Sequence, residues 1–281
     1  MIVRGILIAL SGFLFIFAPG LPMGLLRRFG RSFPREFLYW GMGICLVVTY
    51  LTLFLQSLVR QFVQGARSTA VASAAQPSTT ALSLATPVLM ALLLVGGMAI
   101  YLRRRKLADY EQTEAGLTLG FGAGLIVQVF RGLEFVGAGF RLVYGGTGDP
   151  GLAPLAHLPM LDLLVWLLSE ILFRIAVLTV SGVIGILVAR TVSGSPRTFW
   201  LAAAVYVVFS WLIVAAQLAI GGENPGAILA GQSSLLTSAV TVVYHLAVIA
   251  VTYTWLQRTL TQDPQTSAAP VRRGRRMRKN R

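Results

Sequence analysis

The sequence predicts an all-α fold, a polytopic bundle of about seven transmembrane helices. Hydrophobic residues make up 56% of the 281-residue chain, charged residues only 12%, and the mean hydropathy is +0.73. Such values are typical of membrane proteins and exclude an ordinary soluble domain. The apolar residues also form long blocks, and a helix of about 20 such residues crosses a bilayer because lipid cannot satisfy free backbone N–H and C=O groups.

Seven blocks are long enough to be spans, and basic residues bound several of them. The first ends near Pro19 and lacks a small-residue cleavage pattern, so a removable signal peptide is not expected. Basic residues stand on both sides of the second, at Arg35 and Arg60, and the third is followed directly by Arg103 and its neighbours. The predicted spans are residues 4–25, 37–58, 81–102, 115–130, 163–189, 198–220 and 235–256.

Residues 64–80 separate the second span from the third and read "QGARSTAVASAAQPSTT". This stretch has no helical apolar period and little bulk to anchor in lipid, so it predicts an exposed loop. We therefore expect one integral membrane domain over residues 1–261, followed by a basic tail over residues 262–281.

The basic residues also predict an orientation, because short cytoplasmic loops collect Lys and Arg. With the N-terminus outside and the C-terminus inside, 18 of the 24 basic residues fall on the inner side, five fall outside and Arg174 falls within a span. An even number of spans would scatter the same charges over both sides. A multi-pass protein of a cell membrane, with a bacterial cytoplasmic membrane as the expected location, fits this distribution.

The net charge is +14, the tail contains seven of the 24 basic residues, and the expected partner of the tail is the membrane surface. Each basic residue near an anionic leaflet gains roughly 1 kcal/mol. Since no aromatic residues are interleaved with these charges, a nucleic acid is not the expected partner. The residues predicted to contact anionic lipid headgroups are Arg272, Arg273, Arg275, Arg276, Arg278, Lys279 and Arg281.

Candidate functional groups are the ionisable and polar side chains at membrane depth, since these are costly there and usually functional. Glu170 and Arg174 are four residues apart, with the acid first, which predicts an ion pair on one helical face. Asp162 and Gln128 complete the candidate intramembrane polar site. Glu134 follows Arg131 by three residues and Arg141 lies nearby, which predicts a second pair just after the fourth span.

Metal and nucleophilic chemistry have little support in the sequence, and we expect no cofactor. The chain has two histidines, His157 and His245, in separate segments and without the spacing of a zinc motif. His157, Asp162 and Glu170 are five and eight residues apart, which does not place them on one helical face. No G-x-S-x-G elbow accompanies the serines, and the single Cys45 lies inside a span, where packing is its usual role.

The fourth span carries four glycines in its first part, at Gly116, Gly120, Gly122 and Gly124. Gly116, Gly120 and Gly124 recur every four residues and share a face, which is the small-x-x-x-small pattern of close helix packing. Gly122 lies off that face.

The run "GMAIYLRRRKLADYEQTEAGLTLGFGAGLIVQV", residues 97–129, resembles the central part of the YhfC-like membrane peptidases, distant relatives of the CAAX protease and bacteriocin-processing clan. Tyr101, Leu102, the basic turn and the glycines match that family's scaffold positions. The stretches "SEILFRIAVLTVSGVIGILVAR" and "RTFWLAAAVYVVFSW" are similar to its later spans, with Arg174 at a basic position. The resemblance covers residues 85–215.

The positions that would carry the family's chemistry differ. Gly96 and Gly97 stand where the resemblance places paired glutamates, and Ala123 and Val127 stand where it places a histidine and a glutamate. Residues near Ser181 and Val208 replace the later histidines. The resemblance therefore implies a peptidase-like fold without its catalytic groups.

The sequence thus predicts a non-catalytic membrane protein with a binding or structural role, with another membrane protein as a candidate partner. Two alternatives stay open. A small transporter or channel would line its path with polar groups, for which Gln128, Glu170, Arg174, Gln217 and Tyr244 are candidates. An active membrane peptidase would use Glu170 or Glu134 as its base.

Overall fold

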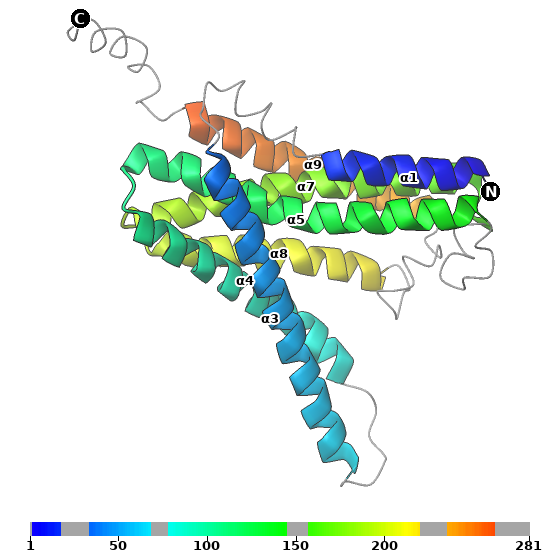
Figure 1. Ribbon diagram of the computed structural model, residues 1–281, viewed down its shortest axis with the longest axis horizontal. Helices are drawn as coiled ribbons and strands as arrows, with labels where there is room; N and C mark the ends of the chain where they lie inside the picture. Colours follow the sequence, from blue (N-terminus) through cyan, green and yellow to red (C-terminus); the bar gives the residue numbers. More distant parts are fainter. Residues whose placement is uncertain (1, 18–33, 69–77, 145–156, 220–234, 262–281) are drawn as a thin grey trace, which may run out of the picture.

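The computed structural model describes residues 2–17, 34–68, 78–144, 157–219 and 235–261, and the regular structure within these residues is entirely helical (Figure 1). The helices are α1 (Ile2–Phe17), α3 (Arg35–Ser68), α4 (Ser78–Arg105), α5 (Asp109–Val143), α7 (Met160–Val192), α8 (Arg197–Ala219) and α9 (Leu235–Thr261). Each of them overlaps one of the seven predicted segments. The predicted all-α membrane bundle is confirmed.

Five of these helices, α3, α4, α5, α7 and α9, are long and apolar enough to cross a membrane. The described apolar parts of α1 and α8, Ile2–Phe17 and Arg197–Leu212, are shorter. Residues 18–25 of the first predicted span lie outside the described residues, as does the basic tail. Seven spans and the orientation therefore stay predictions.

Two predicted boundaries differ from the structure. The exposed loop predicted over residues 64–80 is wrong at both ends, because α3 continues to Ser68 and α4 begins at Ser78, while residues 69–77 lie outside the described residues. The fourth segment is much longer than residues 115–130, so Arg131, Glu134 and Arg141 lie within α5 and not after it. The charges do not end this helix because Arg131 and Glu134 neutralise each other one turn apart, and apolar side chains beyond them, such as Phe135 and Leu142, pack on α1 and α7.

One end of the bundle, which we call the basic end, contains the starts of α3, α5 and α8 and the ends of α4, α7 and α9. Arg105 at the end of α4 forms an ion pair with Glu36 at the start of α3. The Ser193 hydroxyl, beyond α7, donates a 2.5 Å hydrogen bond to Gln112 at the start of α5. The guanidinium of Arg190, in the last turn of α7, lies 5.6 Å from the ring centroid of Trp255 near the end of α9.

Helix α5 is the centre of the fold, and α7 packs against one face of it. Cβ atoms added to Gly116 and Gly120 would collide with the backbone of Gly185 and Ser181 on α7, and one added to Gly124 would lie 3.0 Å from the Ser181 hydroxyl. The predicted glycine face is thus confirmed as a helix-packing face. Only residues without a side chain let two helix backbones approach so closely.

Two further helices, α3 and α1, pack closely against other glycines of α5. A Cβ on Gly122 would collide with the backbone of Leu38, where α3 crosses α5 at a steep angle (Figure 1). At the other end of α5, Gly132 and Gly139 face Gly12 and Gly5 of α1. The contacts are reciprocal, with added Cβ atoms 2.5–2.7 Å from the carbonyl oxygens opposite. Since Gly5 meets Gly139 and Gly12 meets Gly132, α1 runs antiparallel to α5.

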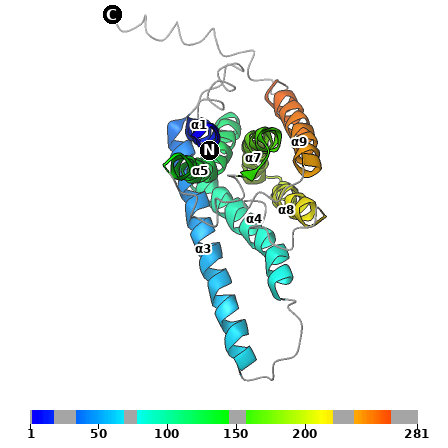
Figure 2. The ribbon, with the colours of Figure 1, turned by 90° about the vertical axis from the view of Figure 1, so that its right-hand side faces the viewer.

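The remaining helices surround this centre. Viewed from one end, α5 lies next to α1 and α3 on one side and α7 on the other, while α9 lies beyond α7 (Figure 2). Thr252 of α9 donates a 2.8 Å hydrogen bond to Thr179 of α7, and α7 and α9 run parallel. Helices α3 and α4 diverge from the bundle towards their connection (Figures 1 and 2).

Buried apolar side chains form two separate cores. The larger core includes Leu125 and the preceding part of α5 and begins on α7 at Leu178. The smaller core includes Phe135 and the following part of α5, ends on α7 at Leu167, and is completed by α1. The interval between the two cores on α5 and α7 is where the candidate site lies.

We expect Gly120→Ala to destabilise the bundle by about 1–3 kcal/mol, because the new methyl group would push α7 away from α5. Gly96→Ala is the matched control, since a Cβ there meets no atom within 4 Å. The measurement is SDS-induced unfolding of the purified protein in mixed micelles. Equal loss of stability in the two variants would contradict the packing role of Gly120.

Candidate functional site in a polar layer

Polar side chains fill the interval between the two apolar cores. We call this set the polar layer. Three helices contribute to it, and the central group is a buried arginine of α7. The members of the polar layer are Gln128, Arg131 and Glu134 of α5, Ser169, Glu170 and Arg174 of α7, and His245 of α9.

Arg174 and Glu170 form the ion pair that their spacing predicts. The Arg174 Nη2 atom lies 2.8 Å from Glu170 Oε2, and the exposed fractions of the two side chains are 7% and 16%. The guanidinium also lies 4.7 Å from the ring centroid of Phe173 and 5.7 Å from that of Phe15 on α1. A carboxylate and two aromatic rings therefore compensate the charge that burial would otherwise make costly.

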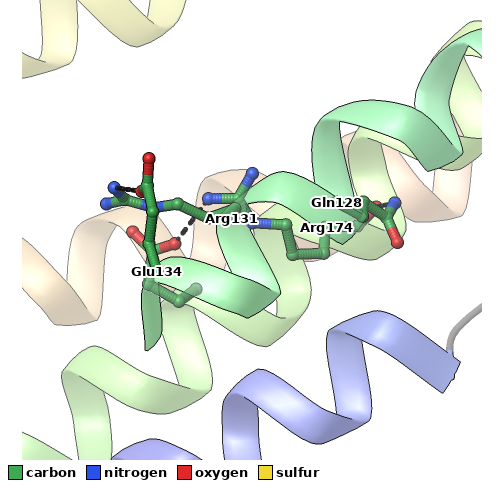
Figure 3. Close-up of polar contacts among 5 residues, drawn as sticks. Gln128, Arg131, Glu134 and Arg174 are labelled. Carbon is green, nitrogen blue, oxygen red and sulfur yellow. Dashed lines mark hydrogen bonds and ion pairs between the residues drawn. The ribbon is translucent and has the colours of Figure 1, made fainter. Parts of the chain in front are cut away.

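Gln128 joins α5 to the same place. Its side chain is fully buried, and its Nε2 atom donates a 2.8 Å hydrogen bond to the backbone carbonyl of Arg174 (Figure 3). One turn further along α5, Arg131 Nη1 lies 2.6 Å from Glu134 Oε2. The second predicted ion pair is thus present, and its charges act on Arg174.

Exposure falls steadily through the polar layer. The exposed fraction of the side chain is 62% for Glu134, 20% for Arg131, 16% for Glu170 and 7% for Arg174. The exposed members cannot face acyl chains cheaply, because charged groups in hydrocarbon cost several kcal/mol. The Glu134 side of the layer must therefore contact water, headgroups or another polar surface.

Helix α9 contributes His245, which is 3% exposed. Its imidazole lies beside the backbone of Ser169 and 5.2 Å, centroid to centroid, from the ring of Phe173. The sequence suggests only a metal-ligand role for His245 and does not predict this contact. A usable signal was present, since Ser238, His245 and Thr252 recur every seven residues and so share one face of α9.

Several buried polar atoms of this region lack a hydrogen-bond partner. Within the described residues, such atoms are Gln128 Oε1, Arg174 Nε, His245 Nδ1 and Tyr244 Oη. The first three belong to the polar layer, and Tyr244 is adjacent to His245. Buried polar atoms are normally satisfied, so their concentration in one region indicates a place that water or a ligand completes.

Other predicted site residues lie elsewhere. Asp162 is in the first turn of α7, two turns before Glu170, and His157 is exposed before that helix begins. The side chain of Gln217 lies outside the described set. Among the described residues, no three His, Cys, Asp or Glu side chains are grouped closely enough to hold a metal ion.

The four positions at which the sequence departs from the YhfC-like pattern have different neighbours. A Cβ on Gly97 would lie 3.1 Å from Ile44 of α3, and Gly96 has no neighbour within 4 Å. Ala123 is buried where α3 crosses α5, whereas Val127 is 41% exposed. No family model, curated protein or solved structure matches this chain, so the resemblance stays a prediction.

We expect Arg174→Met to destabilise the protein by about 3–5 kcal/mol, because it leaves Glu170 buried without its partner. Replacing both residues, as Arg174→Met with Glu170→Gln, should restore most of the loss. Arg131→Met is the matched control and should cost about 1 kcal/mol or less, since Glu134 is largely exposed. Unfolding in mixed micelles measures the stability of all three variants. A double variant as unstable as Arg174→Met alone would contradict the pairing of Arg174 with Glu170.

Proposed function

We propose that this chain is a non-catalytic membrane protein that binds a ligand or the polar part of a membrane partner in its polar layer. The observation that carries the proposal is the set of buried polar atoms without partners at Gln128, Arg174 and His245. Each such group costs about 1–3 kcal/mol while it is unsatisfied, and this is free energy that the hydrogen bonds of a bound ligand would recover.

The arrangement of the charges supports binding over catalysis. Glu170 is the carboxylate that an intramembrane peptidase would use to activate water, and its Oε2 atom already accepts a hydrogen bond from Arg174. Glu134 is paired with Arg131 in the same way. The YhfC-like resemblance implies that the chain is a member of a peptidase-like family. It would have kept the fold of that family and would use it for binding.

A transporter is the second candidate function, and the position of the polar layer favours it. The layer separates two apolar cores, and sites of secondary transporters commonly lie at mid-membrane between such regions. Gln128, Glu170 and Arg174, which the sequence analysis names for a transport path, are in contact. In either case the expected location is a bacterial cytoplasmic membrane.

The test combines stability with ligand response. Gln128→Leu and His245→Phe remove unpartnered polar atoms, and Gln128→Leu also removes the hydrogen bond to the Arg174 carbonyl, so we expect each variant to lose no more than about 1 kcal/mol of stability. A solute from a panel of small polar metabolites that stabilises the wild type should lose its effect on both variants. At 100 times its Kd such a ligand stabilises by about 2.7 kcal/mol.

Thr252→Val is the control. It removes the hydrogen bond to Thr179 outside the polar layer, so it should lower stability by about 1 kcal/mol and leave the ligand response intact. A loss of more than about 1 kcal/mol in Gln128→Leu and His245→Phe, with no ligand response in the wild type, would contradict the proposal. Uptake of a stabilising solute by proteoliposomes would favour the transporter.

A further inference from the structure

The basic end of the bundle carries charge that its own acids do not balance. Eight basic residues of the described chain lie there, against four acids, Glu36, Asp109, Glu111 and Glu114. Glu36 is already paired with Arg105, and a Glu111 oxygen accepts a hydrogen bond from the backbone of Ala108. The eight are Arg35, Arg103, Arg104, Arg105, Lys106, Arg190, Arg197 and Arg258.

One of these arginines lies over an aromatic ring between α7 and α9. The Arg190 guanidinium lies 5.6 Å from the ring centroid of Trp255. Arg258 follows Trp255 by three residues and therefore lies on the same face of α9. We call Arg190, Trp255 and Arg258 the basic–aromatic site.

The two arginines of this site are available to a ligand. Both are exposed, and in the described part of the chain the ion pairs involve Arg105, Arg131 and Arg174 but neither Arg190 nor Arg258. A Trp ring beneath a guanidinium restricts it and leaves its N–H edge free to donate hydrogen bonds. The Arg190 edge on α7 and the Arg258 guanidinium, one turn beyond Trp255 on α9, are the donors that would bind phosphate oxygens.

The position of the basic–aromatic site along the membrane normal indicates which kind of molecule supplies the phosphate. Arg190 and Arg258 stand in the last turns of two parallel helices, both apolar enough to span a membrane. Trp residues concentrate at the membrane interface, and basic pockets between helices on that side bind anionic headgroups. A free nucleotide or an RNA would not require an aromatic group at this level.

We propose that the basic–aromatic site binds the phosphate of an anionic phospholipid. The site is formed by folded helices and is distinct from the tail beyond residue 261, for which the sequence predicts a diffuse contact with the same leaflet. It shares no residue with the polar layer, so the inference is independent of the proposed function.

The test measures binding of phosphatidylglycerol to the full-length protein by native mass spectrometry, with phosphatidylcholine as the reference lipid. We expect Arg190→Gln with Arg258→Gln to weaken phosphatidylglycerol binding roughly thirtyfold, on the basis of about 1 kcal/mol for each residue. Phosphatidylcholine binding should not change. The matched control, Arg103→Gln with Arg104→Gln, removes two exposed charges from the same end and should weaken binding much less.

Two further variants separate the alternatives. Trp255→Phe keeps an aromatic ring and both charges, so it should reduce phosphatidylglycerol affinity less than the double arginine variant does. Replacing all basic residues of 271–281 by Gln should leave the difference between the two arginine pairs intact. Equal effects of the two pairs would show a diffuse charge, and an effect of the tail replacement alone would show binding by the tail, so either result would overturn the proposal.

Discussion

The close approach of α5 to three other helices is the constraint on which the rest of the structure depends. Its glycines admit α7 near Gly116 and Gly120, α3 at Gly122, and α1 at Gly132 and Gly139. In a membrane, where helices gain little from apolar burial, such contacts supply much of the packing energy. The paths of α1, α3 and α7 are therefore fixed by positions on a single helix.

The polar layer lies where α5 changes its closest partner. Gly124 is the last glycine that faces α7, and Gly132 is the first that faces α1. Between them no glycine brings a backbone close, so side chains fill the space, and Gln128 reaches across it to the carbonyl of Arg174. The two apolar cores end on either side for the same reason. The position of the polar layer is thus a consequence of glycine spacing.

Much of this arrangement can be predicted from the sequence. Hydropathy predicts the helices, and the spacing of Glu170 and Arg174 predicts their ion pair. Both features can be predicted because they depend on local periodicity. The length of α5 could not be predicted, since Arg131 and Glu134 read as a helix end until their pairing and the packing of α1 are known. The place of His245 beside Ser169 depends on the parallel docking of α9, which sequence spacing does not specify.

Charge balance explains how the polar layer persists within an apolar bundle. Arg174 with Glu170 and Arg131 with Glu134 each sum to zero, so the layer contains strong donors and acceptors without a net charge. The desolvation cost is met by pairing and by the rings of Phe15 and Phe173. The groups of the layer that remain unsatisfied are hydrogen-bond donors and acceptors, whereas its charges are already balanced. A neutral, hydrogen-bonding occupant therefore complements the layer better than an ion does.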